Sequence, residues 1–515
     1  MDLKMMLEDV AARYGEKTAI ISGDTRLSYS DLEKASNRVA NTLKRLDVNK
    51  GDRVVLMLAN SLELAVTYFG TVKTGAIAVP MDPKYKVDEL TSLFADSLPK
   101  ILVTDSATLE PLAPHLSKFG YIENIIEVGN EYKGQSLKYE EILASGSVEP
   151  LDVDLSPEDI AWIGYTSGPS FDPRGVMLSH HSLLTEAIMS GDGYQQTDKD
   201  IMMLYALPMF HVYGMVASFL ASIYRGSTVV MVPGTGLSIG NFMEAIEREK
   251  GTMFLGVPFI FSLALQMAEK EGIKNDLSSL RLCASAGAVL PAEVKKRFKE
   301  LYGFEILDCW GLTEAVCHLT CPPLNGHVNI ASVGKALSGW KLKVIDDDNK
   351  ELPPDKNGEI IVSGPIMKGY YNNPRATGEV IKDGWLYTGD IGKFDDEGNL
   401  YITGRKKDTI IVKGQNINPG DIEGVLSNHP AVAEAVVIGI PDRLRGEIIG
   451  AIISLKQGRT ATEQELKQLC LERLINYKVP KQIIIVDSLP KTHDGKIDKN
   501  AVRASLSIPP VFEKL

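Results

Sequence analysis

The strongest constraint on the fold is an alternation of apolar, β-rich runs with amphipathic stretches along the N-terminal half of the chain. Two stretches predict helices, Leu62–Lys73 and Val87–Ala95. The runs around and after them predict strands at Val54–Met57, Ala76–Val79, Ile101–Val103, Thr228–Val232, Met253–Val257 and Leu280–Ala284. Because strands that alternate with helices form parallel sheets with helices on their faces, the pattern predicts an α/β architecture.

The pattern changes near residue 326, where short strands separated by Gly- and Asp-rich turns replace the alternation. The acidic segment 346–358 is predicted to be a solvated turn rather than a metal site. After Gly404 an α+β pattern begins, with enough chain for a compact domain of roughly 100 residues. We therefore predict a large N-terminal domain (1–404) of two parallel-type α/β subdomains plus a small β-barrel or antiparallel sheet, and a mobile α+β C-terminal domain (405–515).

Charge and cysteine content narrow the classes of function. The chain has 515 residues and a net charge of −12, which argues against general nucleic-acid binding. Five cysteines are few, and their odd number favours a reducing, cytoplasmic compartment. Segment 1–15 carries acidic side chains where a signal peptide would be apolar, and it predicts a surface helix. The apolar stretch Ile201–Tyr224 contains Pro208 and His211, so buried core beside a pocket is favoured over a transmembrane segment.

A loop of small hydroxyl residues and glycines follows a β-type segment at Gly164–Val176. Its backbone N–H groups and hydroxyls could donate hydrogen bonds to phosphate oxygens, and Arg174 could neutralise their charge. The loop lacks the spacing of a Walker P-loop and the frame of a nucleophile elbow. An ordinary Gly/Pro loop is therefore the alternative interpretation.

Two further segments place aromatic, hydroxyl and acidic residues in patterns typical of nucleotide chemistry. In Asp308–Glu314, Trp310 could lie on a purine, and the Thr–Glu pair offers the oxygen ligands that Mg²⁺ prefers. In Tyr387–Asp390 the aspartate could accept hydrogen bonds from both hydroxyls of a ribose. Taken alone, the first could be a strand-to-loop junction and the second a common Asp turn.

Basic residues gather where the sequence pattern changes and again near the C-terminal end. Gly404–Asp408, followed by Lys413 and Gly414, suggests a hinge, although a run of cations is usually a solvated face. Leu489–Lys496 is a glycine-containing loop that presents a lysine at its end.

In this order, these motifs together resemble the adenylate-forming superfamily of acyl-CoA synthetases, adenylation domains and luciferases. The resemblance covers nearly the whole chain, and it rests on segments 27–32, 165–175, 208–214, 285–288, 310–314, 358–360, 387–390, 404–408 and 495–496. It implies a two-step ligase that uses ATP, Mg²⁺ and coenzyme A. A carboxylate attacks the α-phosphorus of ATP to give an acyl adenylate and pyrophosphate, the small domain rotates, and a thiol then displaces AMP.

The resemblance also implies roles for individual residues. ATP and AMP would be bound by Thr166, Ser167, Gly168, Ser170, Arg174, Gly287, Ala288, Asp308, Trp310, Gly311, Thr313, Asp390, Arg405 and Lys496. The residues implied in catalysis are Lys496, Glu314, Thr313, His211 and Arg405, with Glu314 as the metal ligand. The acyl site would include His211, Tyr213, Ala286 and Gly287, the CoA tunnel Lys413 and Gly414, and the hinge Lys407.

The phosphate loop departs from the family pattern at three positions. Pro169 removes a hydroxyl and an N–H donor, Phe171 replaces a glycine, and Arg174 replaces the usual lysine. These changes predict weak binding of ATP and pyrophosphate and near-normal binding of AMP.

The substrate is expected to be a medium-chain, aromatic or alicyclic carboxylic acid, because apolar residues dominate Pro208–Ile223 and Val257–Phe261. Lys413 and Gly414 favour coenzyme A as the acceptor, and the protein is expected to be a monomer or a homodimer. Two alternatives stay open, an acyl-AMP ligase that loads a carrier protein and a non-catalytic nucleotide- or acyl-binding homologue. Segment Cys317–Cys321 with His327 could bind a metal, but pocket-wall or core positions are favoured.

Overall fold

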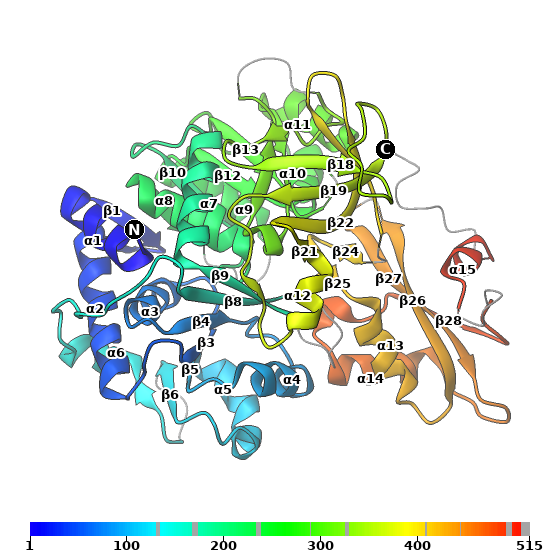
Figure 1. Ribbon diagram of the computed structural model, residues 1–515, viewed down its shortest axis with the longest axis horizontal. Helices are drawn as coiled ribbons and strands as arrows, with labels where there is room; N and C mark the ends of the chain where they lie inside the picture. Colours follow the sequence, from blue (N-terminus) through cyan, green and yellow to red (C-terminus); the bar gives the residue numbers. More distant parts are fainter. Residues whose placement is uncertain are drawn as a thin grey trace.

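A computed structural model describes residues 1–129, 134–166, 174–232, 238–288, 290–324, 329–406, 409–442, 444–490 and 497–505. Figure 1 shows two helix-covered sheets in the N-terminal part, an antiparallel sheet (yellow-green) beside them, and a separate unit (orange) formed by the C-terminal part. We call residues 409–505 the C-terminal unit. The predicted α/β class, with two parallel-type sheets, a small β unit and an α+β C-terminal unit, is confirmed by this architecture.

The first sheet has eight strands in the order β20-β9-β8-β4-β3-β5-β6-β7. Its strands pair in parallel except for β8 with β9 and β9 with β20. The strands are β3 (Arg53–Met57), β4 (Ile77–Pro80), β5 (Ile101–Asp105), β6 (Asn124–Val128), β7 (Leu137–Lys138), β8 (Ile160–Thr166), β9 (Arg174–Ser179) and β20 (Gly369–Tyr370). The helices of this region are α2 (Tyr29–Arg45), α3 (Leu62–Lys73), α4 (Val87–Ser97), α5 (Ser106–Leu112), the 3₁₀ helix η1 (Ala113–Lys118) and α6 (Tyr139–Ser145).

The second sheet has seven strands in the order β14-β13-β12-β10-β11-β1-β2, all parallel except β1 with β2. The strands are β1 (Thr18–Ser22), β2 (Thr25–Ser28), β10 (Ile201–Leu204), β11 (Thr228–Met231), β12 (Met253–Gly256), β13 (Leu282–Ser285) and β14 (Ile306–Asp308). The helices are α1 (Leu3–Tyr14), α7 (His180–Gly193), the π-helical segment η2 (Tyr213–Leu220), α8 (Ala221–Arg225), α9 (Ile239–Glu249), α10 (Pro258–Glu271) and α11 (Ala292–Tyr302).

Helix α3 shows how the sequence determines where a helix begins and how it packs. Ser61 precedes it and accepts a hydrogen bond from the amide of Leu64 at 3.2 Å, which satisfies a donor of the first turn. The helix is buried from Leu64 to Lys73. It can lie between layers of the fold because its residues are apolar on nearly all sides. Phe69 contacts Phe219 of η2, with ring centroids 5.8 Å apart, and so joins the two halves of the core.

The apolar stretch Ile201–Tyr224 forms strand β10, a loop, and the consecutive helical segments η2 and α8. A Cβ atom on Gly214 would lie 2.4 Å from the carbonyl oxygen of Pro208, so only glycine permits this close approach. Among the described residues, no helix combines the length and apolarity needed to cross a membrane. The stretch is buried and partly lines a cavity, as predicted.

The β-rich region after residue 310 contains a three-stranded and a five-stranded sheet, both antiparallel. The first comprises β15 (Trp310–Gly311), β16 (His318–Cys321) and β17 (Lys335–Ala336). The second, an open half-barrel, comprises β18 (Lys341–Ile345), β19 (Gly358–Ser363), β21 (Ile381–Lys382), β22 (Trp385–Phe394) and β23 (Leu400–Arg405). Two short helical segments complete the region, η3 (Thr313–Ala315) and α12 (Pro374–Val380).

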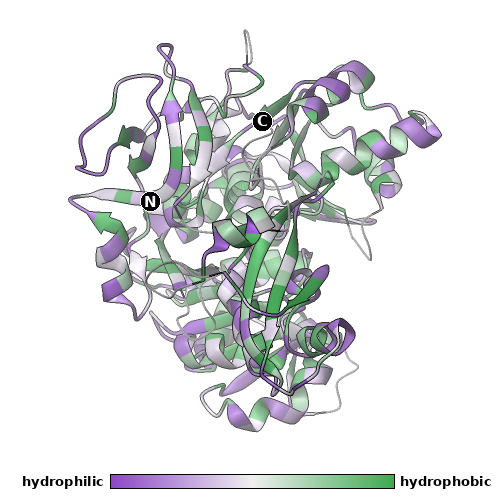
Figure 2. Cartoon of the chain, turned by 90° about the vertical axis from the view of Figure 1, so that its right-hand side faces the viewer, coloured by the Kyte–Doolittle hydropathy of each residue, from purple (hydrophilic) through white to green (hydrophobic). Residues whose placement is uncertain are grey.

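The C-terminal unit has its own sheet and its own core. The strands are β24 (Ile410–Val412), β25 (Gln415–Ile417), β26 (Val432–Asp442), β27 (Gly446–Leu455) and β28 (Gln482–Val486), and the helical segments are α13 (Pro419–Ser427), α14 (Glu463–Arg473), η4 (Asn476–Lys478) and α15 (Lys499–Ser505). Its core includes Ile417, Ile422 and Leu426, all fully buried. Figure 2, in which this unit faces the viewer, shows its strands as mainly apolar. The predicted hinge residue Lys407 lies outside the described residues, so the boundary at 404/405 stays a prediction.

Candidate active site

A cavity of about 370 Å³ lies at the carboxyl ends of β13 and β14. Ligands of parallel α/β sheets bind at this end of the strands, because the loops that follow the strands form a crevice there. Segments from the antiparallel sheets and the turn between β24 and β25 complete the lining. The cavity brings together many of the residues expected from the sequence: His211, Tyr213, Ala286, Gly287, Ala288, Asp308, Trp310, Gly311, Thr313, Asp390, Lys413 and Gly414.

Some of the remaining expected residues are described but do not line this cavity, and the others lie outside the described residues. Glu314 follows Thr313 directly, and Arg174 begins β9, where it is partly buried. Thr166 ends β8 and Arg405 ends β23, where Arg405 is the register partner of Asp390. The expected positions that lie outside the described residues are Ser167, Gly168, Pro169, Ser170, Phe171, His327, Lys407 and Lys496.

Trp310 and Asp390 meet at the wall of the cavity although they belong to different sheets. The indole Nε1 of Trp310 donates a hydrogen bond to Oδ2 of Asp390 at 2.9 Å. Asp390 is only 1% exposed, so this bond fixes both a ring and a carboxylate that the sequence assigns to nucleotide binding.

Asp308 forms a buried ion pair that sequence reasoning missed. Its Oδ2 lies 2.9 Å from Nζ of Lys295, a residue of α11, and both side chains are less than a tenth exposed. Burial raises the pKa of Asp308 to about 6, and Lys295 opposes that rise. Lys295 gave no sequence signal because it lies in a helix rich in lysine, a pattern that normally indicates a solvated face.

The C-terminal unit reaches the cavity through the turn between β24 and β25. Gly287 has φ +83°, and a Cβ atom there would lie 3.6 Å from the carbonyl oxygen of Gly414. Gly414 has φ +82°, and a Cβ atom there would lie 2.7 Å from Cγ1 of Val257. The absence of a side chain at Gly414 therefore lets the backbone of the C-terminal unit approach Val257 closely, and both positive φ angles favour glycine. Beside them the ammonium of Lys413 lies 4.5 Å from the ring centroid of Phe259.

The lining of the cavity also includes two histidines that are neutral. Burial lowers the pKa of His211 to about 4 and that of His318 to about 3, so both imidazoles are neutral at neutral pH. His318 lies 2.9 Å through Nδ1 from the hydroxyl of Tyr194, and its ring contacts Tyr213 edge-to-face. Cys317 and His318 line the cavity and Cys321 is buried, as favoured. Within the described ranges no group of three or more His, Cys, Asp and Glu side chains is placed to hold a metal ion.

Glu314 contacts a tyrosine that sequence reasoning missed. Its Oε1 accepts a hydrogen bond of 2.8 Å from the hydroxyl of Tyr370. The guanidinium of Arg174 lies over the ring of the same tyrosine, 5.4 Å from its centroid. Tyr370 forms part of β20, a strand of two residues that is too short for any periodic sequence signal.

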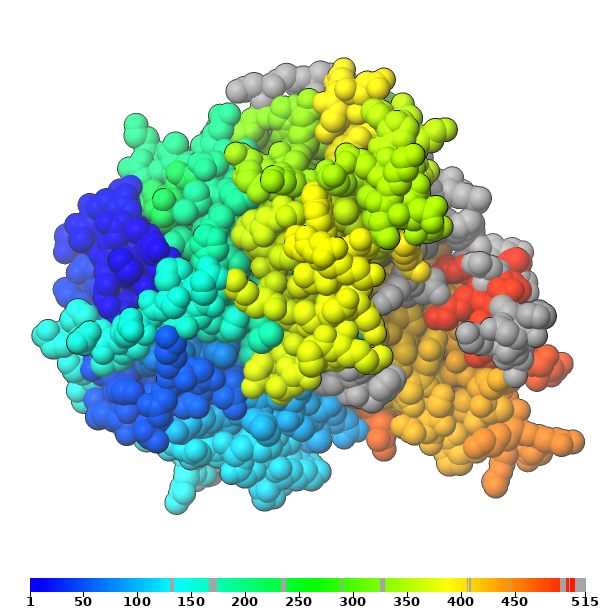
Figure 3. All heavy atoms as spheres, in the orientation of Figure 1, coloured from blue at the N-terminus to red at the C-terminus, as the bar shows by residue number. Residues whose placement is uncertain are grey.

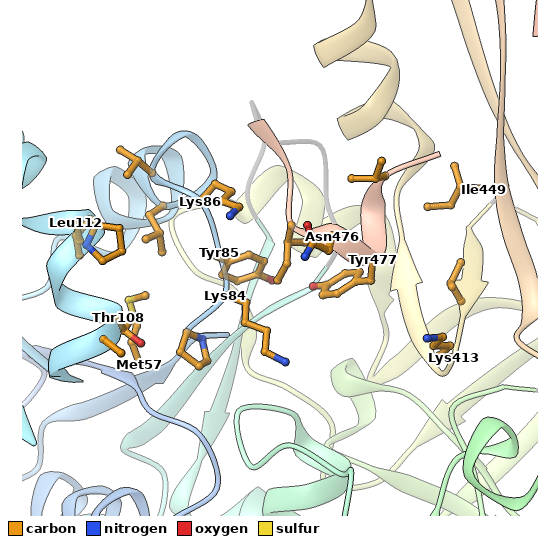
Figure 4. A pocket seen from close by; sticks show the side chains of 18 of the residues that line it. Met57, Lys84, Tyr85, Lys86, Thr108, Leu112, Lys413, Ile449, Asn476 and Tyr477 are labelled. Atoms are coloured by element: carbon orange, nitrogen blue, oxygen red, sulfur yellow. The ribbon is translucent and has the colours of Figure 1, made fainter. Parts of the chain in front are cut away.

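A second cavity, of about 720 Å³, lies between the N-terminal part and the C-terminal unit. Its lining includes five cations and, among the described residues, no carboxylate; the cations are Lys84, Lys86, Lys413, Arg445 and Lys481. Figure 4 shows Tyr85 and Tyr477 pointing toward one another across it. Lys413 lines this cavity and the first one, so the two cavities adjoin at that residue.

The chain is similar to known proteins along almost its entire length. The AMP-binding enzyme family matches residues 7–371, and the C-terminal domain of AMP-binding enzymes matches residues 421–496. A long-chain-fatty-acid–CoA ligase of Bacillus subtilis is 33% identical, over 96% of this chain and 93% of its own length.

Solved structures give the same result. An amide bond synthetase from Marinactinospora thermotolerans aligns with a TM-score of 0.88 at 26% identity, covering 98% of this chain and 99% of its own. An o-succinylbenzoate CoA synthetase from Bacillus subtilis, a double mutant bound to a product analogue, aligns with a TM-score of 0.85 at 28% identity, covering 97% and 98%. The chain therefore belongs to the AMP-binding enzyme family, the adenylate-forming acyl-CoA synthetases that its motifs resemble.

Proposed function

We propose that the protein is an ATP-dependent carboxylate–CoA ligase that acts on a medium-chain, aromatic or alicyclic acid. One observation carries the proposal: two cavities adjoin at Lys413, one lined by the expected nucleotide and acyl residues and the other by cations. The first suits an acyl adenylate, and the second suits the phosphates of coenzyme A.

In the first step, a carboxylate oxygen of the acid attacks the α-phosphorus of ATP. The bond from that phosphorus to the bridging oxygen breaks, and pyrophosphate leaves. Trp310 and Asp390 would hold adenine and ribose, and Thr313 would bind the α-phosphate. Arg174 and Lys496 would neutralise phosphate charge, on which transfers of this kind depend. Glu314 and Thr313 supply the oxygen donors that suit Mg²⁺, which would add positive charge at the phosphates when bound.

The acid itself would lie against His211, Tyr213, Ala286 and Gly287. The imidazoles of His211 and His318 are neutral, so an apolar acyl group can be buried against them without leaving a charge of theirs unpaired. The whole cavity holds about 370 Å³ and must also take AMP, which favours a compact acyl group over a long chain.

In the second step, the sulfur of the CoA thiol attacks the acyl carbonyl, its proton is lost, and AMP leaves. The cationic cavity offers Lys84, Lys86, Arg445 and Lys481 to the phosphates of CoA, which are attracted to such a concentration of positive charge. The thiol arm would pass Lys413 and Gly414. The position of this turn at the cavity supports the inference that the described arrangement serves thioester formation. The resemblance assigns Lys496 to the first step, with a rotation about Lys407 between the two steps.

We also propose a cytoplasmic location, because the five cysteines are free and buried. We further propose that the protein is a monomer or a homodimer.

The decisive experiment is pyrophosphate exchange with a panel of carboxylic acids, followed by AMP release with and without CoA. Exchange that depends on an acid, with AMP release that depends on CoA, supports the proposal. Exchange without CoA dependence indicates a carrier protein or an amine as acceptor. No exchange with any acid indicates a non-catalytic binding protein.

A further inference from the structure

The hydroxyl and the ring of Tyr370 contact two groups that the proposed function assigns to Mg²⁺ and to the ATP phosphates. Tyr370 donates a hydrogen bond of 2.8 Å to Oε1 of Glu314, the expected metal ligand. The face of its ring carries the guanidinium of Arg174, the expected phosphate-binding cation. Tyr370 itself is 4% exposed, so these contacts are made in the interior rather than in solvent.

The backbone on both sides of Tyr370 is fixed by hydrogen bonds to the segments that carry these partners. The amide of Tyr371 donates to the carbonyl of Gly175 at 2.7 Å, next to Arg174. The amide of Met367 donates to the carbonyl of Glu314 at 2.9 Å. The short segment 367–371 therefore bridges β9 and the Thr313–Glu314 turn, and Tyr370 lies at the centre of the bridge.

We propose that Tyr370 is a positioning residue, which orients Glu314 toward Mg²⁺ through its hydroxyl and holds Arg174 toward the β- and γ-phosphates through its ring. The inference rests on the proposed function and names a residue that the sequence motifs did not include. A phenol bound to one carboxylate oxygen fixes the rotamer of Glu314 and directs the other oxygen at a defined angle.

The same arrangement gives a reason for arginine at position 174. A planar guanidinium can lie flat on an aromatic ring and still direct its N–H groups at phosphate oxygens, whereas a lysine ammonium is a point charge on a flexible stem. The ring of Tyr370 therefore explains why arginine rather than the usual lysine suits position 174.

The test compares Tyr370→Phe, which keeps the ring and removes the hydroxyl, with wild type. The expected result is an ATP dissociation constant, measured by calorimetry in the presence of Mg²⁺, that rises about tenfold, the value for loss of one hydrogen bond to a charged group. The Mg²⁺ concentration that half-saturates adenylation should rise as well. AMP binding and thioester formation from supplied acyl adenylate should stay unchanged. Tyr371→Phe is the matched control, because that tyrosine packs in another cluster.

Unchanged Mg²⁺ and ATP dependence in Tyr370→Phe overturns the proposal, as does an equal loss of AMP binding, which would indicate general damage to the fold. Glu314→Gln provides a second check. If Tyr370 acts through Glu314, adding Tyr370→Phe to Glu314→Gln should weaken ATP binding little further, and fully additive losses overturn the inference. Wild type that binds ATP and Mg²⁺ but activates no acid would contradict the proposed function alone. Wild type that binds neither would overturn both.

Discussion

A buried ion cluster fastens the C-terminal unit to the N-terminal part and permits a sharp test of how the two dock. Nζ of Lys478 lies 3.0 Å from Oε1 of Glu89 and 2.9 Å from Oδ2 of Asp421. The amide of Ile475 donates to the other oxygen of Glu89 at 2.9 Å. Burial lowers the pKa of Lys478, but Asp421 and Glu89 more than compensate, so the pKa lies above its ordinary value and the ammonium stays charged. Figure 3 shows the C-terminal unit (orange) next to the light-blue segment of the N-terminal part.

The most informative change is Glu89→Gln, because it removes the charge that crosses the interface and leaves the pair of Lys478 with Asp421 inside the C-terminal unit. Glu89 is 6% exposed, so solvent screens the lost interaction little. A hydrogen bond to a charged group contributes about 1.5–3 kcal/mol. The docked arrangement should therefore lose roughly 10- to 150-fold in population relative to undocked forms.

The assay is hydrogen–deuterium exchange of the segment that contains the Ile475 amide, together with the rate of thioester formation from supplied acyl adenylate. We expect faster exchange and a slower second step, with acyl-adenylate formation retained. Asp88→Asn is the matched control: Asp88 pairs with Arg473 at 3.3 Å, but both side chains are at least half exposed, and such pairs contribute little. Equal effects of the two variants, or unchanged exchange in Glu89→Gln, would refute the reasoning.

Three further predictions concern residues of the proposed reaction. Lys496→Ala should nearly abolish acyl-adenylate formation, measured by pyrophosphate exchange, while thioester formation from supplied acyl adenylate persists; equal loss of both steps would contradict its role. Lys481→Ala removes one cation of the second cavity and should raise the KM for CoA up to about fivefold, because an exposed ion pair contributes at most ~1 kcal/mol; the KM for ATP is the control. Pro169→Thr combined with Phe171→Gly should lower the calorimetric Kd for ATP and leave that for AMP unchanged, and an equal gain for both would refute the idea.

The elements of the N-terminal part could be predicted because their signals are local. The predicted helix Leu62–Lys73 has the observed bounds, and the predicted strand Val54–Met57 differs from β3 by one residue. Many residues that line the cavity were expected as well, because the resemblance of the motifs to one family assigns them to a common site. The rest could not. Lys295 turns inward from a lysine-rich helix to pair with Asp308, and only tertiary packing selects it from its neighbours.

The interface between the C-terminal unit and the N-terminal part includes a buried ion cluster, and such a cluster would suit the predicted movement of a unit that docks and then leaves. Replacing a buried ion pair with apolar residues often makes a protein more stable, so such a pair adds little net stability. Removing one partner, in contrast, is costly because it leaves a buried charge unpaired. A buried pair therefore discriminates strongly between aligned and misaligned arrangements. Glu89 and Lys478 place this discrimination beside the cationic cavity, and Gly287 and Gly414 place a close backbone contact beside the acyl adenylate site. Docking is thereby coupled to the position of Lys413, the residue that the two cavities share. The proposed second step would begin only when the charges at the interface are correctly paired.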